Sequence, residues 1–293
     1  MTNQDDYISG NRDYWNEVTS IHEKSRFYDV GSFKKGKPTI MPLEIKEIGK
    51  VKEKTLLHLQ CHFGIDTISW ERMGAQAIGV DLSDKSIETA RRLAKELNSN
   101  VQFICSDIYK LPTVLNNQFD IVYSTGGVLC WLPDLDKWAK VVSSFVRPGG
   151  FFYLRDDHPF AVILDENLNI NGDYFHQDKP IVEPPSGSYA DPNATVTKCN
   201  YEWHHSLSDI IDSLIRANLK IDFFHEFPFL GWARFPQLMK LNNDGWYRFK
   251  EEKINMPLMF SLKATKQLTF IPCRSKRLLI PYTGTMSRKR KRK

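Results

Sequence analysis

The chain has 293 residues, of which 41% are hydrophobic and 26% charged, ordinary values for one large globular domain with insertions. The formal net charge is +5, but nine Lys or Arg and no acid follow residue 272, so that 31 basic residues face 35 acidic ones before it. This slightly acidic body disfavours a track for nucleic-acid phosphates.

Several other classes of protein are also disfavoured. No uninterrupted apolar run is long enough to cross a bilayer, and the polar start at residues 1–7 does not resemble a signal peptide. The five cysteines are scattered, odd in number and without a CxxC pair, so we expect a reduced cytoplasmic protein without disulfides or a zinc site. They are Cys61, Cys105, Cys130, Cys199 and Cys273.

An aromatic-rich segment precedes the first predicted strand. Residues 11–31 predict one or two short helices, within an N-terminal helical cap that we place at residues 1–54. Its aromatic side chains suit either a lid that closes over a site or simple packing on the sheet edge, and both remain open. They are Tyr14, Trp15, Phe27 and Tyr28.

Apolar runs and helical patterns then alternate along residues 55–156. Ser83 is placed to cap a helix whose apolar residues recur at helical spacing. This alternation implies a parallel sheet covered by helices on both faces. The predicted strands are 55–59, 77–81, 101–105, 119–124 and 150–156, and the predicted helices are 66–73, 83–97 and 135–146, the last stopped by Arg147-Pro-Gly-Gly150.

Two insertions interrupt the later part of the pattern. Residues 157–205 are rich in proline and polar residues, which predicts an irregular insertion or lid over an acceptor site. Residues 206–265 complete the sheet with a helix that starts near Ser206 and strands at 219–224 and 258–264, apart from a second insertion at 227–255.

A basic tail, residues 266–293, ends the chain on six consecutive Lys or Arg. Such a run can bind nucleic acid or act as a targeting signal. It can equally be a disordered solubilising end or an addition made for expression. We favour the second interpretation, because a charge run by itself says little about a partner.

The most informative motif follows the first predicted strand. That strand ends in the loop Gln60-Cys-His-Phe-Gly64, a helix follows, and the second strand ends in Asp81, seventeen residues after Gly64. This order is typical of the nucleotide-binding half of an open α/β sheet, where the acid accepts hydrogen bonds from the ribose hydroxyls of an adenosine. The loop holds one glycine of the dinucleotide pattern, which disfavours NAD or FAD. A ligand with a small amino-acid carboxylate fits better, and Gln60 can hydrogen-bond it.

The residues after the third and fourth predicted strands also fit an adenosine ligand. Asp107 follows the third strand, where a carboxylate can accept the exocyclic amine of adenine, and Ile108 can pack on the face of the base. Ser124 follows the fourth strand, at the edge where the reacting part of a ligand is expected.

Taken in order, these motifs resemble the class I S-adenosylmethionine-dependent methyltransferases of the small-molecule type. The motifs are Leu-His-Leu-Gln-Cys-His-Phe-Gly, Gly-Val-Asp-Leu-Ser, Ser-Asp-Ile, Phe-Asp-Ile-Val-Tyr-Ser and Arg-Pro-Gly-Gly, and the first is typical of a bacterial subgroup. The likeness covers residues 55–156 well and 206–265 by topology. It implies an α/β, Rossmann-like fold with a seven-stranded, mostly parallel sheet, helices on both faces and an antiparallel last strand.

The resemblance also implies S-adenosylmethionine as cofactor and S-adenosylhomocysteine as product. The loop at Gly64 would hold the methionine part, Asp81 the ribose, Asp107 and Ile108 the adenine, and Ser124 would lie near the sulfonium. The family's usual acid and two glycines are replaced by His58, Gln60 and His62, which therefore do not inherit the standard roles. The full predicted set is Tyr14, Trp15, Gln60, Cys61, Gly64, Asp81, Leu82, Ser83, Asp107, Ile108 and Ser124.

Methyl transfer to an alcohol, phenol or protonated amine benefits from a base. The predicted catalytic residues are His158 and Asp156, just past the fifth strand, with Asp157, His204 and His205 ranked lower. A histidine beside Pro159 is at least as often a turn residue, and adjacent histidines often cap a helix. No ligand cluster for a metal stands out.

We therefore expect an enzyme that methylates a small-molecule acceptor, with no membrane partner. A nucleic-acid methyltransferase, suggested by the tail, is an alternative, although Ser124-Thr-Gly-Gly is not the motif of an adenine-N6 enzyme. A non-catalytic S-adenosylmethionine-binding protein and a dinucleotide-dependent oxidoreductase are the others. The sequence identifies neither the acceptor nor the oligomeric state.

Overall fold

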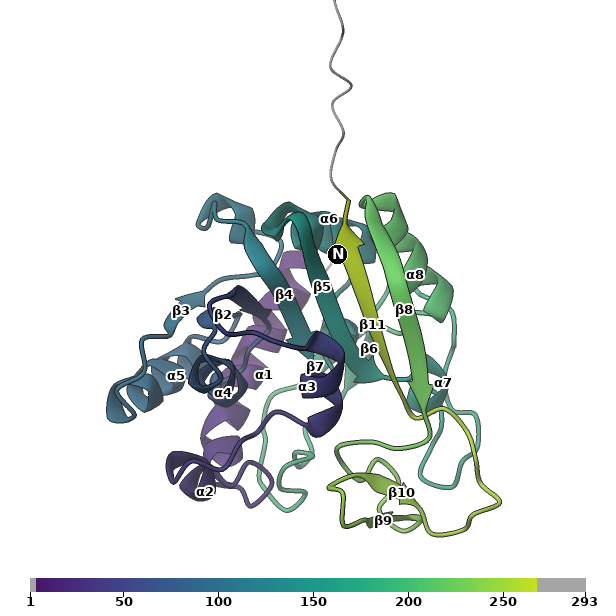
Figure 1. Ribbon diagram of the computed structural model, residues 1–293. Helices are drawn as coiled ribbons and strands as arrows, with labels where there is room; N and C mark the ends of the chain where they lie inside the picture. Colours follow the sequence, from purple (N-terminus) through teal and green to yellow (C-terminus); the bar gives the residue numbers. More distant parts are fainter. Residues whose placement is uncertain (1–3, 268–293) are drawn as a thin grey trace, which may run out of the picture.

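The computed structural model describes residues 4–267. They form one seven-stranded sheet with helices on both sides and two small two-stranded sheets (Figure 1). The predicted basic tail lies outside the described residues from 268 onward. Within residues 4–267, no helix combines the length and apolar character that a membrane span requires.

The large sheet has the strand order β3-β2-β1-β4-β5-β11-β8. The pairs from β3 to β5 are all parallel, and β11 runs antiparallel to both β5 and β8. This confirms the predicted fold class, including the antiparallel last strand. The strands are β1 (Thr55–Leu59), β2 (Gln76–Asp81), β3 (Gln102–Cys105), β4 (Phe119–Thr125), β5 (Val146–Asp157), β8 (Leu219–Phe227) and β11 (Met259–Lys266).

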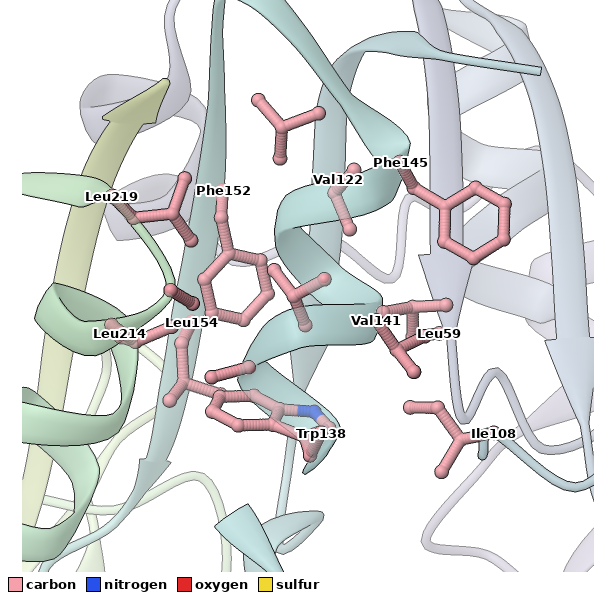
Figure 2. Packing of buried hydrophobic residues seen from close by; sticks show 14 of the residues in the cluster. Leu59, Ile108, Val122, Trp138, Val141, Phe145, Phe152, Leu154, Leu214 and Leu219 are labelled. Atoms are coloured by element: carbon pink, nitrogen blue, oxygen red, sulfur yellow. The ribbon is translucent and has the colours of Figure 1, made fainter. Parts of the chain in front are cut away.

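Helices cover both faces of this sheet. One face packs on α6 and α8 through a hydrophobic cluster with Trp138 and Phe152 at its centre, between Val141 and Leu214 (Figure 2). The other face packs on α4 and α5 through a second cluster, which includes Trp70 and Leu93. The helices are α4 (Ile65–Arg72), α5 (Asp84–Glu96), α6 (Leu135–Phe145) and α8 (Leu207–Arg216), with the 3-10 turns η1 (Leu111–Thr113) and η2 (Leu129–Trp131).

The N-terminal segment differs from the predicted one or two short helices. It forms one helix of 21 residues, α1 (Gln4–Lys24), followed by α2 (Val30–Lys34) and α3 (Pro42–Ile48). The buried residues Tyr14, Val18 and His22 recur four apart on one face of α1. Three of its five buried residues, Asn11, Thr19 and His22, are polar, which hid this period. The stability of the helix comes from packing against α5 and β7.

The segment Arg147-Pro-Gly-Gly150 ends α6 as predicted but also belongs to the next strand. β5 begins at Val146, which pairs with Phe119, and the register shifts before Ile121. A Cβ at Gly150 would lie 2.8 Å from the Asp120 carbonyl oxygen. The two chains therefore approach closely where the ladder is irregular, and such a place tolerates Pro and Gly.

The two insertions contain regular structure that the sequence pattern did not predict. The first holds α7 (Pro159–Val162), β6 (Ile181–Glu183) and β7 (Asn200–Glu202). The second holds β9 (Met239–Leu241) and β10 (Tyr247–Phe249), which pair below the end of β8 and the start of β11 in Figure 1. These strands are only three residues long, too short to leave a recognisable alternation.

Candidate active site

The carboxyl ends of β1 to β5 lie along one edge of the sheet, because these strands are parallel and adjacent. Asp81 pairs with Cys105 at the ends of β2 and β3, and Thr125 pairs with Arg155 near the ends of β4 and β5. The loops that follow therefore share one edge, which brings the predicted residues at 60–64, 81–83, 107–108 and 124 to neighbouring positions.

The loop after β1 has an alternating backbone. Gln60, His62 and Gly64 have φ angles of 55°, 51° and 76°, all in the left-handed region. Glycine is the residue that enters this region without steric cost. Gln60 and His62 thus stand where the resembled family has glycine, and they keep the backbone that glycine favours.

Gly64 is required for space as well as for its φ. A Cβ there would lie 2.4 Å from the Phe103 ring, closer than side chains pack. Phe103 also leaves no room for a Cβ at Gly79. That Cβ would in addition lie 2.9 Å from Cys61 Sγ. Cys61 is only 5% exposed, and burial raises its thiol pKa well above the usual value. Its side chain therefore belongs to the core, while its N–H bonds the Val80 carbonyl at 2.9 Å.

Asp81 joins two of the loops at this edge. Its Oδ2 accepts the His62 N–H at 2.7 Å, and its Oδ1 accepts the Ser83 N–H at 2.9 Å. Burial raises the Asp81 pKa to about 6, against the effect of these backbone N–H groups. Each carboxylate oxygen keeps a lone pair for a further donor.

Leu82 and Ser83 lead from Asp81 into α5. The Ser83 hydroxyl accepts the Ser86 N–H at 3.0 Å and donates to Asn16 Oδ1 at 2.7 Å. The predicted helix cap at Ser83 is thereby confirmed. The Ser83 hydroxyl is therefore bonded to α5 and α1. Beside Asp81, this segment presents the backbone of Leu82 and Ser83 and not the Ser83 side chain.

Asp107 and Ile108 lie beyond β3. Asp107 Oδ1 accepts the Tyr109 N–H at 3.0 Å, and burial raises the pKa of this carboxyl. Ile108 is 8% exposed and belongs to the hydrophobic cluster of the α6 face, where Figure 2 shows it at the margin. One carboxylate and one apolar side chain thus stand next to each other at the tip beside Asp81.

Gln60 bridges the loops that follow β1 and β4. Its Nε2 donates to the Val128 carbonyl at 2.9 Å, while its buried Oε1 has no hydrogen-bond partner among the described residues. Ser124 is fully buried and donates to the carbonyl of Leu59, the residue before Gln60, at 3.2 Å. Buried amide oxygens are nearly always bonded, so the unpaired Oε1 marks a place for a donor.

Helix α1 brings two predicted aromatic residues to the same edge. The Trp15 ring lies 5.0 Å from His62 and 5.1 Å from Trp131, between the loops after β1 and β4. Tyr14 stacks on Trp131 at 5.9 Å, and burial raises its pKa to about 12. Trp15 is therefore close to His62, and Tyr14 to Trp131 of the loop after β4, while Phe27 is 45% exposed.

A histidine pair that the sequence analysis missed connects α1 to this loop. His22 Nδ1 lies 2.9 Å from His62 Nε2, and His22 Nε2 lies 2.5 Å from the Ser188 hydroxyl of the first insertion. His62 Nδ1 lies 3.0 Å from Ser86 Oγ. Burial lowers the pKa of His22 to about 4 and lowers that of His62 well below its usual value, which favours the neutral form of both rings.

Asp156, a predicted base, accepts backbone hydrogen bonds. Its Oδ1 accepts the N–H of Gly127 at 2.6 Å, and its Oδ2 accepts that of Leu129 at 2.9 Å. Val128 and Asp157 donate to it as well. Burial raises its pKa to about 6. In this structure the carboxylate holds the loop after β4 in place.

His158, the other predicted base, is engaged at both ring nitrogens. Nδ1 accepts the Phe160 N–H at 3.1 Å as the cap of α7, and Nε2 lies 2.9 Å from Glu226. Burial lowers its pKa, against the effect of Glu226. The histidine is 3% exposed, and its contacts lie toward β8, not toward Asp81.

Three further histidines have structural partners. His205 Nε2 lies 2.7 Å from the Leu132 carbonyl, and His204 Nδ1 lies 2.6 Å from the Asp173 carbonyl. His58 is buried with Nδ1 at 2.9 Å from Thr67 Oγ1, and burial lowers its pKa to about 3. Within residues 4–267, no group of three or more His, Cys, Asp or Glu side chains is arranged to hold a metal ion.

Residues 57–154 match the family model described as a methyltransferase domain. The chain is 29% identical over 149 residues to a ubiquinone biosynthesis O-methyltransferase of Bordetella avium, covering 47% of this chain and 61% of that protein. A protein of the same description from Serratia proteamaculans is 29% identical over 133 residues, 44% of this chain and 55% of that one. The chain thus spans about three fifths of the length of the curated relatives it matches.

Solved structures share the fold. An S-adenosylmethionine-dependent methyltransferase from Clostridium acetobutylicum matches with a TM-score of 0.54 and 16% identity, over 87% of this chain and 99% of that one. Magnesium protoporphyrin IX methyltransferase from Synechocystis, solved with bound SAH, matches with a TM-score of 0.53 and 16% identity, over 89% of this chain and 100% of that one. Residues 57–154 are thus similar to a methyltransferase domain, and the sheet in which they lie has the fold of these solved structures, as the sequence motifs predict.

Proposed function

We propose that this chain transfers the methyl group of S-adenosylmethionine to a small-molecule acceptor. The observation that carries the proposal is the placement of Asp81 and Asp107 at the tips of the neighbouring strands β2 and β3. Both are partly exposed, yet burial raises the pKa of each. Such carboxylates gain from further hydrogen-bond donors, and ribose hydroxyls and an adenine amine are donors of the right kind.

The loop after β1 fits the amino-acid end of the same cofactor. Gln60 Oε1 is an unpaired buried acceptor, and an ammonium group would supply the missing donor. The start of α4 follows directly at Ile65, and the first N–H groups of a helix suit a carboxylate. The residues that would hold the cofactor are Gln60, the backbone at 61–64, Asp81, Asp107 and Ile108.

The chemistry asked of the protein is modest. The cofactor supplies an activated methyl group on a sulfonium sulfur, so the protein must mainly align the acceptor and keep water out. The rings of Tyr14 and Trp15 lie against Trp131 of the loop after β4, and Trp15 also contacts His62 of the loop after β1. They can stabilise a cation that lies against them.

The proposal also gives a role to two segments outside the core of the domain. We propose that α1 within residues 1–54 and the insertion at 157–205 act together as a lid. His22 contacts Ser188 of that insertion, and the Tyr28 hydroxyl hydrogen-bonds the Tyr189 hydroxyl.

We also propose that the protein works in the cytoplasm, since the four cysteines in residues 4–267 are free thiols.

Calorimetric titration of the purified protein with S-adenosylmethionine tests the proposal. We expect binding, no binding of NAD, and a loss of at least about tenfold in affinity for Asp81→Ala, because about 1.4 kcal/mol is lost with the two ribose bonds. Asp136→Ala, which removes an exposed carboxylate paired to Arg216, is the control and should bind normally. Binding of NAD alone, or unchanged affinity in Asp81→Ala, would refute the proposal.

A further inference from the structure

A second group of polar side chains lies beside the loop after β4, on strand β7. The Trp203 N–H bonds the Cys130 carbonyl at 2.8 Å, which fixes β7 against η2. The Tyr201 N–H bonds Asn11 Oδ1 at 2.8 Å, which fixes β7 against α1. The first insertion therefore contributes β7 to the wall around Tyr14 and Trp131.

Asn200 and Glu202 project from the same face of β7, because side chains alternate along a strand. Asn200 is 9% exposed, and its amide hydrogen-bonds the Tyr14 hydroxyl. Its buried Oδ1 has no partner among the described residues. Like Gln60 Oε1, this oxygen is an acceptor that lacks a donor.

Glu202 is partly exposed, and no hydrogen bond to its carboxylate is found within residues 4–267. Burial raises its pKa to about 7. The charged and titratable groups around it are Tyr14, Cys130, Asp157, Glu183 and Arg234. The two acids, Asp157 and Glu183, disfavour its ionised form, and the cation Arg234 favours it.

The one cation of this group is already engaged. Arg234 donates to the Ala161 carbonyl at 2.8 Å and to the Val162 carbonyl at 2.7 Å. Asp157 accepts the indole N–H of Trp232 at 3.1 Å. The wall thus offers the carboxylate of Glu202 and the amide oxygen of Asn200 without a donor for either, beside the aromatic rings of Tyr14 and Trp131.

We propose that the methyl acceptor is a primary or secondary amine, bound as its ammonium ion by Glu202 and Asn200, and that Glu202 removes the proton that makes its nitrogen nucleophilic. This inference rests on the proposed function. An ammonium ion brings both the N–H donors and the positive charge that this wall lacks, and aromatic faces favour it. A neutral hydroxyl acceptor would bring a donor but no charge.

The proton and the electrons balance in this step. The ammonium ion gives one proton to the Glu202 carboxylate, which leaves a neutral amine with a free electron pair. That pair forms the nitrogen–carbon bond to the methyl group while the carbon–sulfur bond breaks and its electrons remain on sulfur. The product is an N-methylated ammonium ion, a neutral thioether and protonated Glu202, which returns its proton to water.

The test uses the full chain and matched pairs of probes, phenethylamine with phenethyl alcohol and benzylamine with benzyl alcohol. Tritium transfer from labelled S-adenosylmethionine measures turnover, and calorimetry with S-adenosylhomocysteine present measures binding of each probe. We expect the amines to bind and react at least about tenfold better than the alcohols, a difference of about 1.4 kcal/mol. The rate should rise with pH through about 7, where Glu202 ionises.

Glu202→Gln separates this role from cofactor binding. We expect it to keep its affinity for S-adenosylmethionine, to lose kcat/KM for amines by about a hundredfold and to lose the rise near pH 7. Glu166→Gln removes an exposed carboxylate of the same insertion and should behave like the wild type.

Each contrary outcome has one meaning. A chain that does not bind S-adenosylmethionine refutes the proposed function itself. A chain that binds it but prefers the alcohols, or that neither binds nor methylates any amine of the panel, refutes the amine proposal alone. Unchanged turnover and pH profile in Glu202→Gln refutes the role of Glu202.

Discussion

His62 donates its backbone N–H to Asp81 Oδ2 over 2.7 Å, from a left-handed backbone with a φ of 51°. This hydrogen bond holds the loop after β1 to the tip of β2. Its donor is a main-chain group, so the bond does not depend on the side chain at position 62. This explains how the loop keeps its shape although Gln60 and His62 replace glycines of the resembled pattern. The side chain of His62 is left free to bond His22 and Ser86.

Gly64→Ala should be far more harmful than a substitution at another left-handed glycine. A Cβ at Gly64 meets Phe103 at 2.4 Å, whereas nothing lies within 4 Å of one at Gly126, which has a φ of 84°. We expect Gly64→Ala to lower the free energy of unfolding by about 3 kcal/mol or more, from crowding plus backbone strain. Gly126→Ala should cost about 1–2 kcal/mol, from strain alone. Equal losses in urea denaturation would contradict the packing argument.

Gln60→Leu should weaken cofactor binding with little loss of stability. Leucine keeps the volume but removes both the donor to Val128 and the unpaired Oε1. We expect affinity for S-adenosylmethionine to fall about three- to tenfold, the worth of one hydrogen bond. Gln118→Leu is the control, since Gln118 also donates to a backbone carbonyl, that of Ser144 at 3.2 Å, but near the start of β4. Calorimetry that finds the two variants alike would remove Gln60 from the site.

The sequence predicted the sheet and the strand-end residues because both depend on local patterns. Asp81 could be found from its place after an apolar run, and Ser83 from its place before a helical one. Glu202 and His22 could not, because their meaning depends on partners far along the chain, at Asp157 and His62. The four-residue spacing of Tyr14, Val18 and His22 could have indicated that His22 is buried, but the polar composition of α1 concealed this pattern.

The same distinction applies to the predicted bases. Asp156 and His158 stand at the end of β5, where a catalytic group is expected, and position alone does not show which bonds a side chain makes. In the structure the Asp156 carboxylate accepts backbone N–H groups, and the His158 ring bonds a backbone N–H group and Glu226. A role in proton transfer remains a prediction for both residues.

Asp156→Asn distinguishes a positioning role from a catalytic one. Replacing one carboxylate oxygen by an NH₂ group places a donor against the N–H groups of the loop after β4. We expect a loss of about 2–4 kcal/mol in the free energy of unfolding, since several charge-assisted bonds are broken. Asp157→Asn, which leaves that loop untouched, should cost less. A normal Tm with lost turnover in Asp156→Asn would favour the role of a base.

The contact between α1 and the loop after β1 should depend on pH through His22. Burial lowers its pKa in the folded chain to about 4, below the ordinary histidine value of 6.5, so the unfolded chain takes up a proton between these values that the folded chain does not. Its contribution to stability is therefore complete above pH 6.5 and falls toward pH 4, by up to about 1.4 kcal/mol per pH unit.

His22→Asn tests this linkage. At pH 7.5 the variant should be less stable than the wild type by about 1–3 kcal/mol, and the difference should shrink as the pH falls to 5. Thr19→Val removes a hydroxyl that lies 2.8 Å from Ser86 Oγ in the same region, and its deficit should not change with pH. A constant deficit for His22→Asn across pH 5–7.5 in thermal unfolding would contradict the assignment.

The most direct test of the account is a crystal structure of the protein with S-adenosylhomocysteine. We predict that the ribose hydroxyls lie within hydrogen-bond distance of Asp81 and the adenine amine within that distance of Asp107. The amino-acid end should reach Gln60 Oε1. A nucleoside bound elsewhere, with Asp81 and Asp107 facing only water or protein, would contradict the central claim.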